Sequence, residues 1–178
     1  MRLELEAANG ILSAGLAIVL QFFSAQYLGM TTPLQLVDLS RPDQPLLRKL
    51  LTTAPGTYQH SLQVANMAEQ AAELIGADTL LTRVGALYHD IGKTDNPLFF
   101  IENQIPGTAN PHDSLAPEAS SRIIIQHVAD GLTLAKKHRI PVRIQEFISE
   151  HHGTTMTRYQ YGRAVQAAGN PDLVDEKR

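Results

Sequence analysis

A histidine and an aspartate stand side by side in the middle of the chain, within Val84-Gly-Ala-Leu-Tyr-His-Asp-Ile-Gly-Lys93. The spacing of apolar residues predicts a helix over 79–91 that carries His89 and Asp90 on its last turn, with Lys93 just past its end. An imidazole and a carboxylate together can hold a divalent metal, and the second carboxylate oxygen can be shared with another metal. On a helix the two side chains lie about 100° apart, so they meet one metal only at the edge between them.

Two more histidines lie on predicted helices before and after this pair. His60 lies near the start of a helix predicted over 57–75, and His127 lies within a helix predicted over 117–138. Each is one turn away from apolar core positions, so each side chain is expected to face the inside. A helical bundle can gather such side chains from facing helices into one site. A buried, hydrogen-bonded core histidine is the alternative interpretation of His60.

His151 and His152 end a further predicted helix, over 141–152. Ordinary capping is one interpretation of this pair. The inward-facing candidates on the other helices favour the second, in which both are metal ligands. We predict a structural or surface role for His112, and for His138 an exposed position that compensates the dipole at a helix end.

Composition limits the ligands and the partners. The chain has 178 residues, a net charge of −3 and no cysteine. Histidine and carboxylate are therefore the available metal ligands, and disulfides are excluded. The length allows one domain with a sizeable core and one appended element. No basic stripe is present, so binding to a nucleic acid duplex through its phosphates is not expected.

The N-terminal region is apolar and free of charged residues from Ala7 to Val37. Residues 7–30 are long enough for a transmembrane helix, which needs about 20 residues. The alternative is an amphipathic helix that packs on the domain or on a partner. Positive charges follow this segment at Arg48 and Lys49, which would place its C-terminal side in the cytoplasm.

The remaining segments complete an all-α helical bundle with an N-terminal apolar helix. Three prolines exclude a continuous helix over 31–45, which is expected to be a linker. The chain between 93 and 116 is expected to be a long loop with at most one helical turn. A further helix is predicted over 154–168, followed by a polar tail over 169–178.

Five motifs in order resemble the PgpH-type seven-transmembrane branch of the HD-domain metal-dependent phosphohydrolase superfamily. They are Pro55-Gly-Thr-Tyr-Gln-His-Ser-Leu62, Tyr88-His-Asp-Ile-Gly-Lys93, Phe100-Ile-Glu-Asn-Gln104, Asn110-Pro-His-Asp113 and His151-His-Gly-Thr-Thr155. The resemblance covers about residues 10–165. It implies a phosphodiesterase that hydrolyses cyclic di-AMP to linear pApA. It also implies that residues 7–30 end a transmembrane helix in the cell membrane, with the HD domain in the cytoplasm.

The resemblance further implies two divalent metal ions, usually iron or manganese. The first would be held by His60, His89 and Asp90, and the second by Asp90, His127, His151 and His152. Asp90 would bridge the two ions. Lys93 matches a lysine that assists proton transfer or phosphate binding in HD enzymes, so Asp90 and Lys93 are the expected catalytic residues.

The resemblance divides the chain into four parts. They are the end of a transmembrane helix (1–30), a linker with a short helix (31–54), an HD domain (55–168) and a polar tail (169–178). The family's pattern ends with one more metal-binding aspartate on a later helix, and this chain stops at Arg178. We therefore expect the HD domain to be truncated and the full protein to continue.

Two rival functions stay open, and so does the oligomeric state, a homodimer included. One rival is an HD phosphohydrolase that acts on another nucleotide. The other is a sensor domain that binds metal or nucleotide without turnover. The Gly-Tyr-Pro motif of relatives that cleave cyclic di-GMP is absent after His151-His152, which argues against that substrate.

Overall fold

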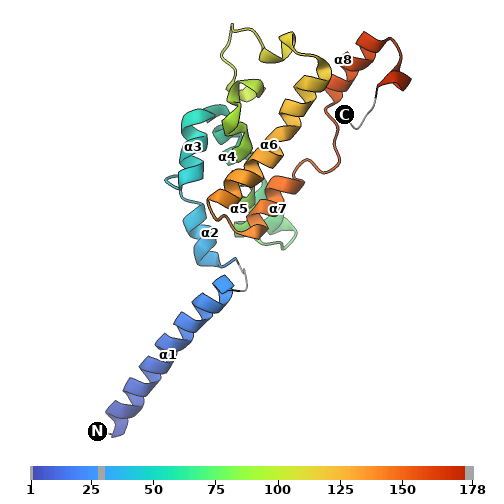
Figure 1. The fold of residues 1–178 in the computed structure, drawn as a ribbon. Helices are drawn as coiled ribbons and strands as arrows, with labels where there is room; N and C mark the ends of the chain where they lie inside the picture. The colour runs from blue at the N-terminus through green and yellow to red at the C-terminus, as the bar shows by residue number, and fades with distance from the viewer. Residues whose placement is uncertain (1, 28–30, 175–178) are drawn as a thin grey trace.

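The computed structural model describes residues 2–27 and 31–174, and within them the chain is all-α, as predicted. Eight α-helices and five short 3-10 helices are present in this described part. Figure 1 shows α4, α5, α6 and α7 gathered in one bundle, while α1 extends away from it as a separate rod. Helix α8 lies beside the N-terminal half of α6, at the far end from α1.

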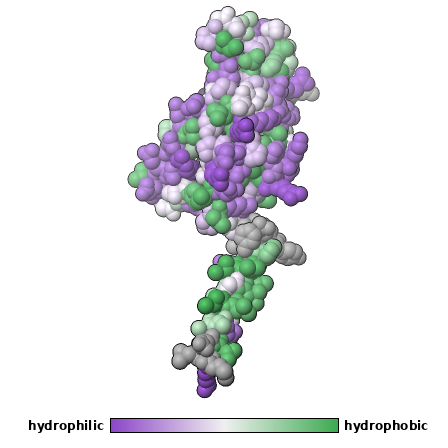
Figure 2. All heavy atoms as spheres, turned by 90° about the vertical axis from the view of Figure 1, so that its left-hand side faces the viewer, coloured by the Kyte–Doolittle hydropathy of each residue, from purple (hydrophilic) through white to green (hydrophobic). Residues whose placement is uncertain are grey.

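Helix α1 (Arg2–Tyr27) exposes its apolar side chains to solvent. Ile11 and Leu12 are about three quarters exposed, and Figure 2 shows apolar residues over most of the visible face of the rod. Among the described residues, no helix combines the length and the apolarity that a membrane span requires. The expected transmembrane helix is therefore not supported there, and residues 28–30 of the expected segment lie outside the described residues. Uncharged polar side chains, Asn9 and Gln21 among them, interrupt the apolar surface.

The segment expected to be a linker contains a helix that joins the core. Helix α2 (Pro33–Leu39) begins after Thr32, whose hydroxyl accepts a hydrogen bond from the Gln35 N–H at 3.3 Å. Pro33 does not prevent this helix because a first-turn proline has no helical N–H to lose. Leu36 and Leu39 are buried, so this part of the linker prediction is wrong. Helix α3 (Pro45–Thr53) follows and buries Leu46, Leu47 and Leu50.

The core lies where the two longest helices of the bundle meet their neighbours. Helix α4 (Pro55–Leu74) packs along α5 (Thr79–Tyr88), and α7 (Val142–Glu150) covers α5 from another side. Helix α6 (Pro117–Lys137) packs on α7 and on the segment after α5. The largest completely buried apolar side chains come from α3, α5, the segment after α5 and α7: Leu47, Leu50, Val84, Tyr88, Ile91, Ile144 and Ile148.

Helix α5 ends earlier than its apolar pattern predicts. It stops at Tyr88, and a 3-10 helix, η1 (Ile91–Asp95), replaces the expected last turn. The backbone leaves the helix at Asp90, where φ is −109° and ψ is 15°. The cause is the close approach of Gly92 to α6. A Cβ atom at Gly92 would lie 1.8 Å from the carbonyl oxygen of His127 and 2.5 Å from the amide nitrogen of Gly131.

The segment after η1 is more ordered than the expected loop. It contains η2 (Pro97–Phe99), η3 (Ile101–Asn103) and η4 (Pro111–Ser114). His112 is buried and holds these turns together, since its Nε2 contacts the carbonyl oxygen of Phe99 at 2.8 Å and its Nδ1 bonds to the Ser120 hydroxyl. This arrangement agrees with the structural role predicted for His112. Beyond α7, helix α8 (Arg158–Ala168) starts four residues later than expected, and η5 (Pro171–Leu173) follows.

Candidate metal centre

Asp90 is the point at which the histidines of four elements meet. Its side chain is only 3% exposed. Oδ2 lies 3.0 Å from Nε2 of His89 and 3.9 Å from Nε2 of His60. Oδ1 faces the other side, 3.3 Å from Nε2 of His127 and 3.5 Å from Nε2 of His151. The early end of α5 makes this possible, because His89 and Asp90 no longer diverge as they would on a continuous helix.

The tautomers of three of these histidines follow from their backbone contacts. In each, Nδ1 faces the carbonyl oxygen of the residue three positions earlier: His89 with Ala86 at 2.6 Å, His127 with Ile124, and His151 with Ile148 at 3.0 Å. A carbonyl oxygen can only accept, so Nδ1 must donate its proton. Nε2 of each neutral ring then carries a free lone pair directed at the other ligands. Metal-binding histidines are held in the same way in known sites.

The candidate ligand atoms form two groups that share Asp90. Within each group all of these atoms lie within 4.8 Å of one another. One group is His60, His89 and Asp90, and the other is Asp90, His127, His151 and His152. The structure thus brings together all six residues that the sequence identified as metal ligands. That they bind metal stays a prediction.

Each of the two groups combines buried ligands with one exposed histidine. His127 is buried, but the His60 side chain is 47% exposed, which corrects the expectation that it faces the core. His152 is also exposed. The centre is therefore closed on the Asp90 side and open at His60 and His152.

Charge in the centre is distributed so that the carboxylate is ionised and the exposed imidazole is neutral. Burial opposes ionisation of Asp90, but the neighbouring imidazoles of His127, His151 and His89 outweigh it and hold its pKa below the usual range. Burial and the neighbouring His151 and His127 lower the pKa of His152 to about 4. At neutral pH both groups are thus in the protonation state that metal binding requires.

Lys93 lies at the edge of the centre, as predicted, between two carboxylates. Its Nζ is 2.8 Å from Oδ2 of Asp90 and 2.9 Å from Oε1 of Glu102. The ammonium also lies 4.9 Å from the centre of the Phe100 ring. Burial lowers the pKa of Lys93, but the two carboxylates outweigh it and the net change is upward. Glu102 was missed by the sequence reasoning, although it lies inside one of the five quoted motifs.

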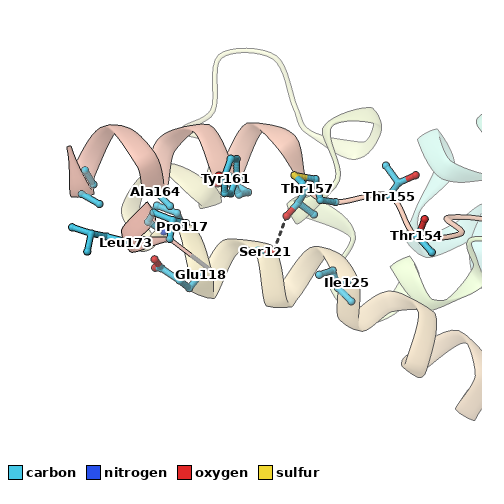
Figure 3. A pocket seen from close by; sticks show the side chains of 15 residues that line it. Pro117, Glu118, Ser121, Ile125, Thr154, Thr155, Thr157, Tyr161, Ala164 and Leu173 are labelled. Carbon is cyan, nitrogen blue, oxygen red and sulfur yellow. Dashed lines mark hydrogen bonds between the residues drawn. The ribbon is translucent and has the colours of Figure 1, made fainter. Parts of the chain in front are cut away.

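A cavity of about 610 Å³ lies to one side of this centre, between α6 and α8. Figure 3 shows Glu118 and Ser121 of α6 on one side of it and Tyr161 of α8 on the other, with Ile125 further along α6. The hydroxyls of Ser121 and Thr157 are hydrogen bonded at 2.7 Å. None of the six candidate ligands lines this cavity. Chemistry is therefore assigned to the Asp90 centre.

Comparison with known proteins gives consistent matches. The family model "HD domain" matches residues 57–175. The chain is 50% identical over 145 residues to "Cyclic-di-AMP phosphodiesterase PgpH" of Listeria monocytogenes, covering 82% of this chain and 20% of that protein. It is 45% identical over 158 residues to the protein of the same name from Bacillus subtilis, covering 89% and 22%. The chain thus spans about a fifth of the length of these two relatives.

A solved structure is similar in both sequence and fold. It is the HD domain of the L. monocytogenes phosphodiesterase PgpH in complex with cyclic-di-AMP. It matches with a TM-score of 0.71 and 50% sequence identity, over 77% of this chain and 62% of that chain. The two domains are therefore similar in amino-acid sequence as well as in fold.

Proposed function

Because this chain belongs to the HD domain family, we propose that it hydrolyses cyclic di-AMP to linear pApA with two divalent metal ions at the Asp90 centre. The observation that carries the proposal is the pair of ligand groups that share Asp90. The substrate comes from the similarity to two cyclic-di-AMP phosphodiesterases and to a domain solved with cyclic-di-AMP.

The residues of the centre fit a pair of metal ions. Oδ1 of Asp90 is buried and makes no hydrogen bond in the structure, although two imidazole nitrogens lie within 3.5 Å of it. Neutral rings that donate from Nδ1 direct their Nε2 lone pairs at this oxygen, and lone pairs that face an anionic oxygen repel it. A cation bound by these nitrogens and the oxygen would remove the repulsion. A set of imidazole and carboxylate ligands without thiolate suits iron or manganese.

In the proposed mechanism the metal ions and the side chains have separate roles. When bound, two divalent ions supply a nucleophile at neutral pH and stabilise charge on the attacking and leaving oxygens of a displacement. Five neutral imidazoles and one carboxylate leave such a pair cationic, which favours a phosphodiester. Asp90 holds both ligand groups in register. Lys93 donates to a phosphate oxygen and shields its charge. The exposed side of His60 and His152 admits the substrate.

Four further expectations remain predictions. They are the extent of the HD domain over residues 55–168, its position in the cytoplasm, its attachment to the cell membrane through residues 7–30, and a homodimer. The absence of a suitable membrane span among the described helices gives the attachment no support.

The test replaces Asp90 by Asn or Ala in protein loaded anaerobically with Fe(II) or Mn(II). We expect both metals and cyclic di-AMP turnover to be lost together, since both ligand groups contain this carboxylate. His138→Ala is the matched control, because His138 is exposed and belongs to neither group. Full activity of a metal-loaded Asp90 variant would contradict the proposal.

A substrate panel separates the proposal from its two rivals. Faster turnover of another nucleotide than of cyclic di-AMP would indicate a general HD phosphohydrolase. Tight binding of cyclic di-AMP by the metal-loaded chain without any product would indicate a sensor. We expect linear pApA as the product and cyclic di-AMP as the preferred substrate.

A further inference from the structure

We infer that Glu102 is a positioning residue that holds the Lys93 ammonium at the edge of the metal centre, facing the phosphate that binds there. The inference rests on the proposed function, because it assigns a carboxylate partner, Glu102, to Lys93, the group proposed to bind phosphate at that site. It concerns a residue outside both ligand groups, and Glu102 would act through Lys93 without touching the substrate.

Lys93 needs a partner other than Asp90. Oδ2 of Asp90 lies beside His60 and His89, and Oδ1 lies beside His127 and His151, so both oxygens would be engaged in a metal-loaded centre. Glu102 is then the carboxylate that remains, with Oε1 at 2.9 Å from Nζ. An ammonium has three N–H donors, so a lysine held by Glu102 keeps a donor for a phosphate oxygen. The Phe100 ring, whose centre lies 4.9 Å from Nζ, restricts the position of the Lys93 ammonium from another side.

Glu102 is itself held in place by the start of α4. The Thr57 hydroxyl donates to Oε1 of Glu102 at 2.9 Å, and Asn103 donates to that hydroxyl at 2.8 Å. The side-chain amide oxygen Oδ1 of Asn103 in turn accepts from the Thr57 backbone N–H at 3.1 Å. Thr57 is completely buried, so these bonds form away from solvent. The position of Glu102 is thus fixed against the same helix that carries His60.

The backbone contact beneath this network leaves little room for displacement. A Cβ atom at Gly56 would lie 1.8 Å from the carbonyl oxygen of Glu102, so the two backbones meet at a glycine. A lysine side chain has four flexible bonds and loses rotamer entropy when it is fixed in one place. A rigid anion at its tip directs it toward one place. This is the geometry expected of a positioning group.

An ordinary loop-stabilising ion pair is the alternative, and the two make different predictions. A structural pair changes the stability of the fold but leaves a bound phosphate unaffected. A positioning pair changes phosphate affinity through Lys93 alone, so its effect disappears when Lys93 is already absent.

The test measures orthophosphate affinity by calorimetry in the metal-loaded full chain, with bound metal counted for each variant. We expect both Glu102→Ala and Lys93→Ala to weaken orthophosphate binding by about tenfold or more, with metal content unchanged. The double variant should bind no more weakly than Lys93→Ala alone. Glu102→Gln keeps an oxygen for Lys93 and Thr57, so it should lose less, about threefold, and it serves if the alanine variant does not fold.

Asp95→Asn is the control, since Asp95 forms an exposed ion pair with Lys49 at 2.9 Å in the neighbouring η1 segment. Its orthophosphate affinity should equal that of the unsubstituted chain. Wild-type affinity in both Glu102 variants, additive losses in the double variant, or no orthophosphate binding by the unsubstituted chain would each overturn the inference. Cyclic di-AMP turnover is measured separately. Orthophosphate binding without turnover would contradict the proposed substrate and leave the Glu102 result to stand on its own.

Discussion

Replacing Gly92 by alanine should separate the two ligand groups without removing any ligand. The added Cβ would lie 1.8 Å from the carbonyl oxygen of His127, whereas ordinary contact begins at 3.4 Å, so the backbones must part by about 1.6 Å. The atoms in the way are backbone and cannot rotate aside. Overpacking of this kind costs typically 1–3 kcal/mol, and we expect the upper end, about 3 kcal/mol. For a chain of this size that lowers Tm by roughly 6–12 °C.

The same displacement moves Asp90 away from His127. In the unsubstituted chain, Oδ1 of Asp90 lies 3.3 Å from Nε2 of His127. Misplacement of about 1 Å can cost a hundredfold in rate, so turnover should fall by about that factor. The assay combines thermal unfolding, metal counting and cyclic di-AMP turnover. Gly162→Ala is the control, because a Cβ there has nothing within 4 Å and lies in helix α8, where alanine is favoured. Unchanged Tm and full turnover in Gly92→Ala would refute the reasoning.

Three further predictions follow from single contacts. Tyr88→Phe removes the buried hydrogen bond to the Leu39 carbonyl oxygen, at 3.0 Å, and should lower the free energy of unfolding by about 1 kcal/mol in urea titration, with metal content unchanged. His112→Ala removes the ring that contacts the Phe99 carbonyl oxygen, so limited proteolysis should cut residues 97–114 faster; equal cutting would argue against this anchor. Burial opposes ionisation of Glu102, but its hydrogen bond with the nearby lysine outweighs it and lowers the pKa. The unfolded chain therefore binds a proton on Glu102 more tightly than the folded chain does. The ionised Glu102 stabilises the fold completely above its ordinary pKa of about 4.3, and this stabilisation is lost as pH falls through the lower pKa of the folded chain. Glu102→Gln should thus be less stable at pH 7 and approach wild-type stability in acid; a constant difference in urea titrations at both pH values would contradict this.

The helices of the bundle were predictable where apolar spacing and terminal signals agree. Residues 117–138 were expected to be helical, and α6 spans Pro117–Lys137, with proline in its first turn. Asp78 is a residue type typical of a helix N-cap, and its carboxylate accepts from the Leu81 N–H at 2.9 Å at the start of α5. Such features depend on residues a few positions apart, so a sequence displays them directly.

Features that depend on distant contacts could not be predicted in the same way. The helix before Asp90 was expected to continue to Ile91, and it ends three residues earlier because Gly92 meets the backbone of α6. The role of Glu102 depends on Thr57, 45 positions away. The candidate ligands were identifiable by their chemistry and spacing. The turn that lets His89 and Asp90 serve one site arises from tertiary packing.

The central claim is that two metal ions share Asp90. Anomalous diffraction from crystals of the Mn(II)-loaded chain tests it most directly, because it locates each ion independently of activity. The account predicts two anomalous peaks, about 3.5–4 Å apart as in known two-metal sites, one on each side of the Asp90 carboxylate. A single peak, or peaks that are not in contact with Asp90, would contradict it.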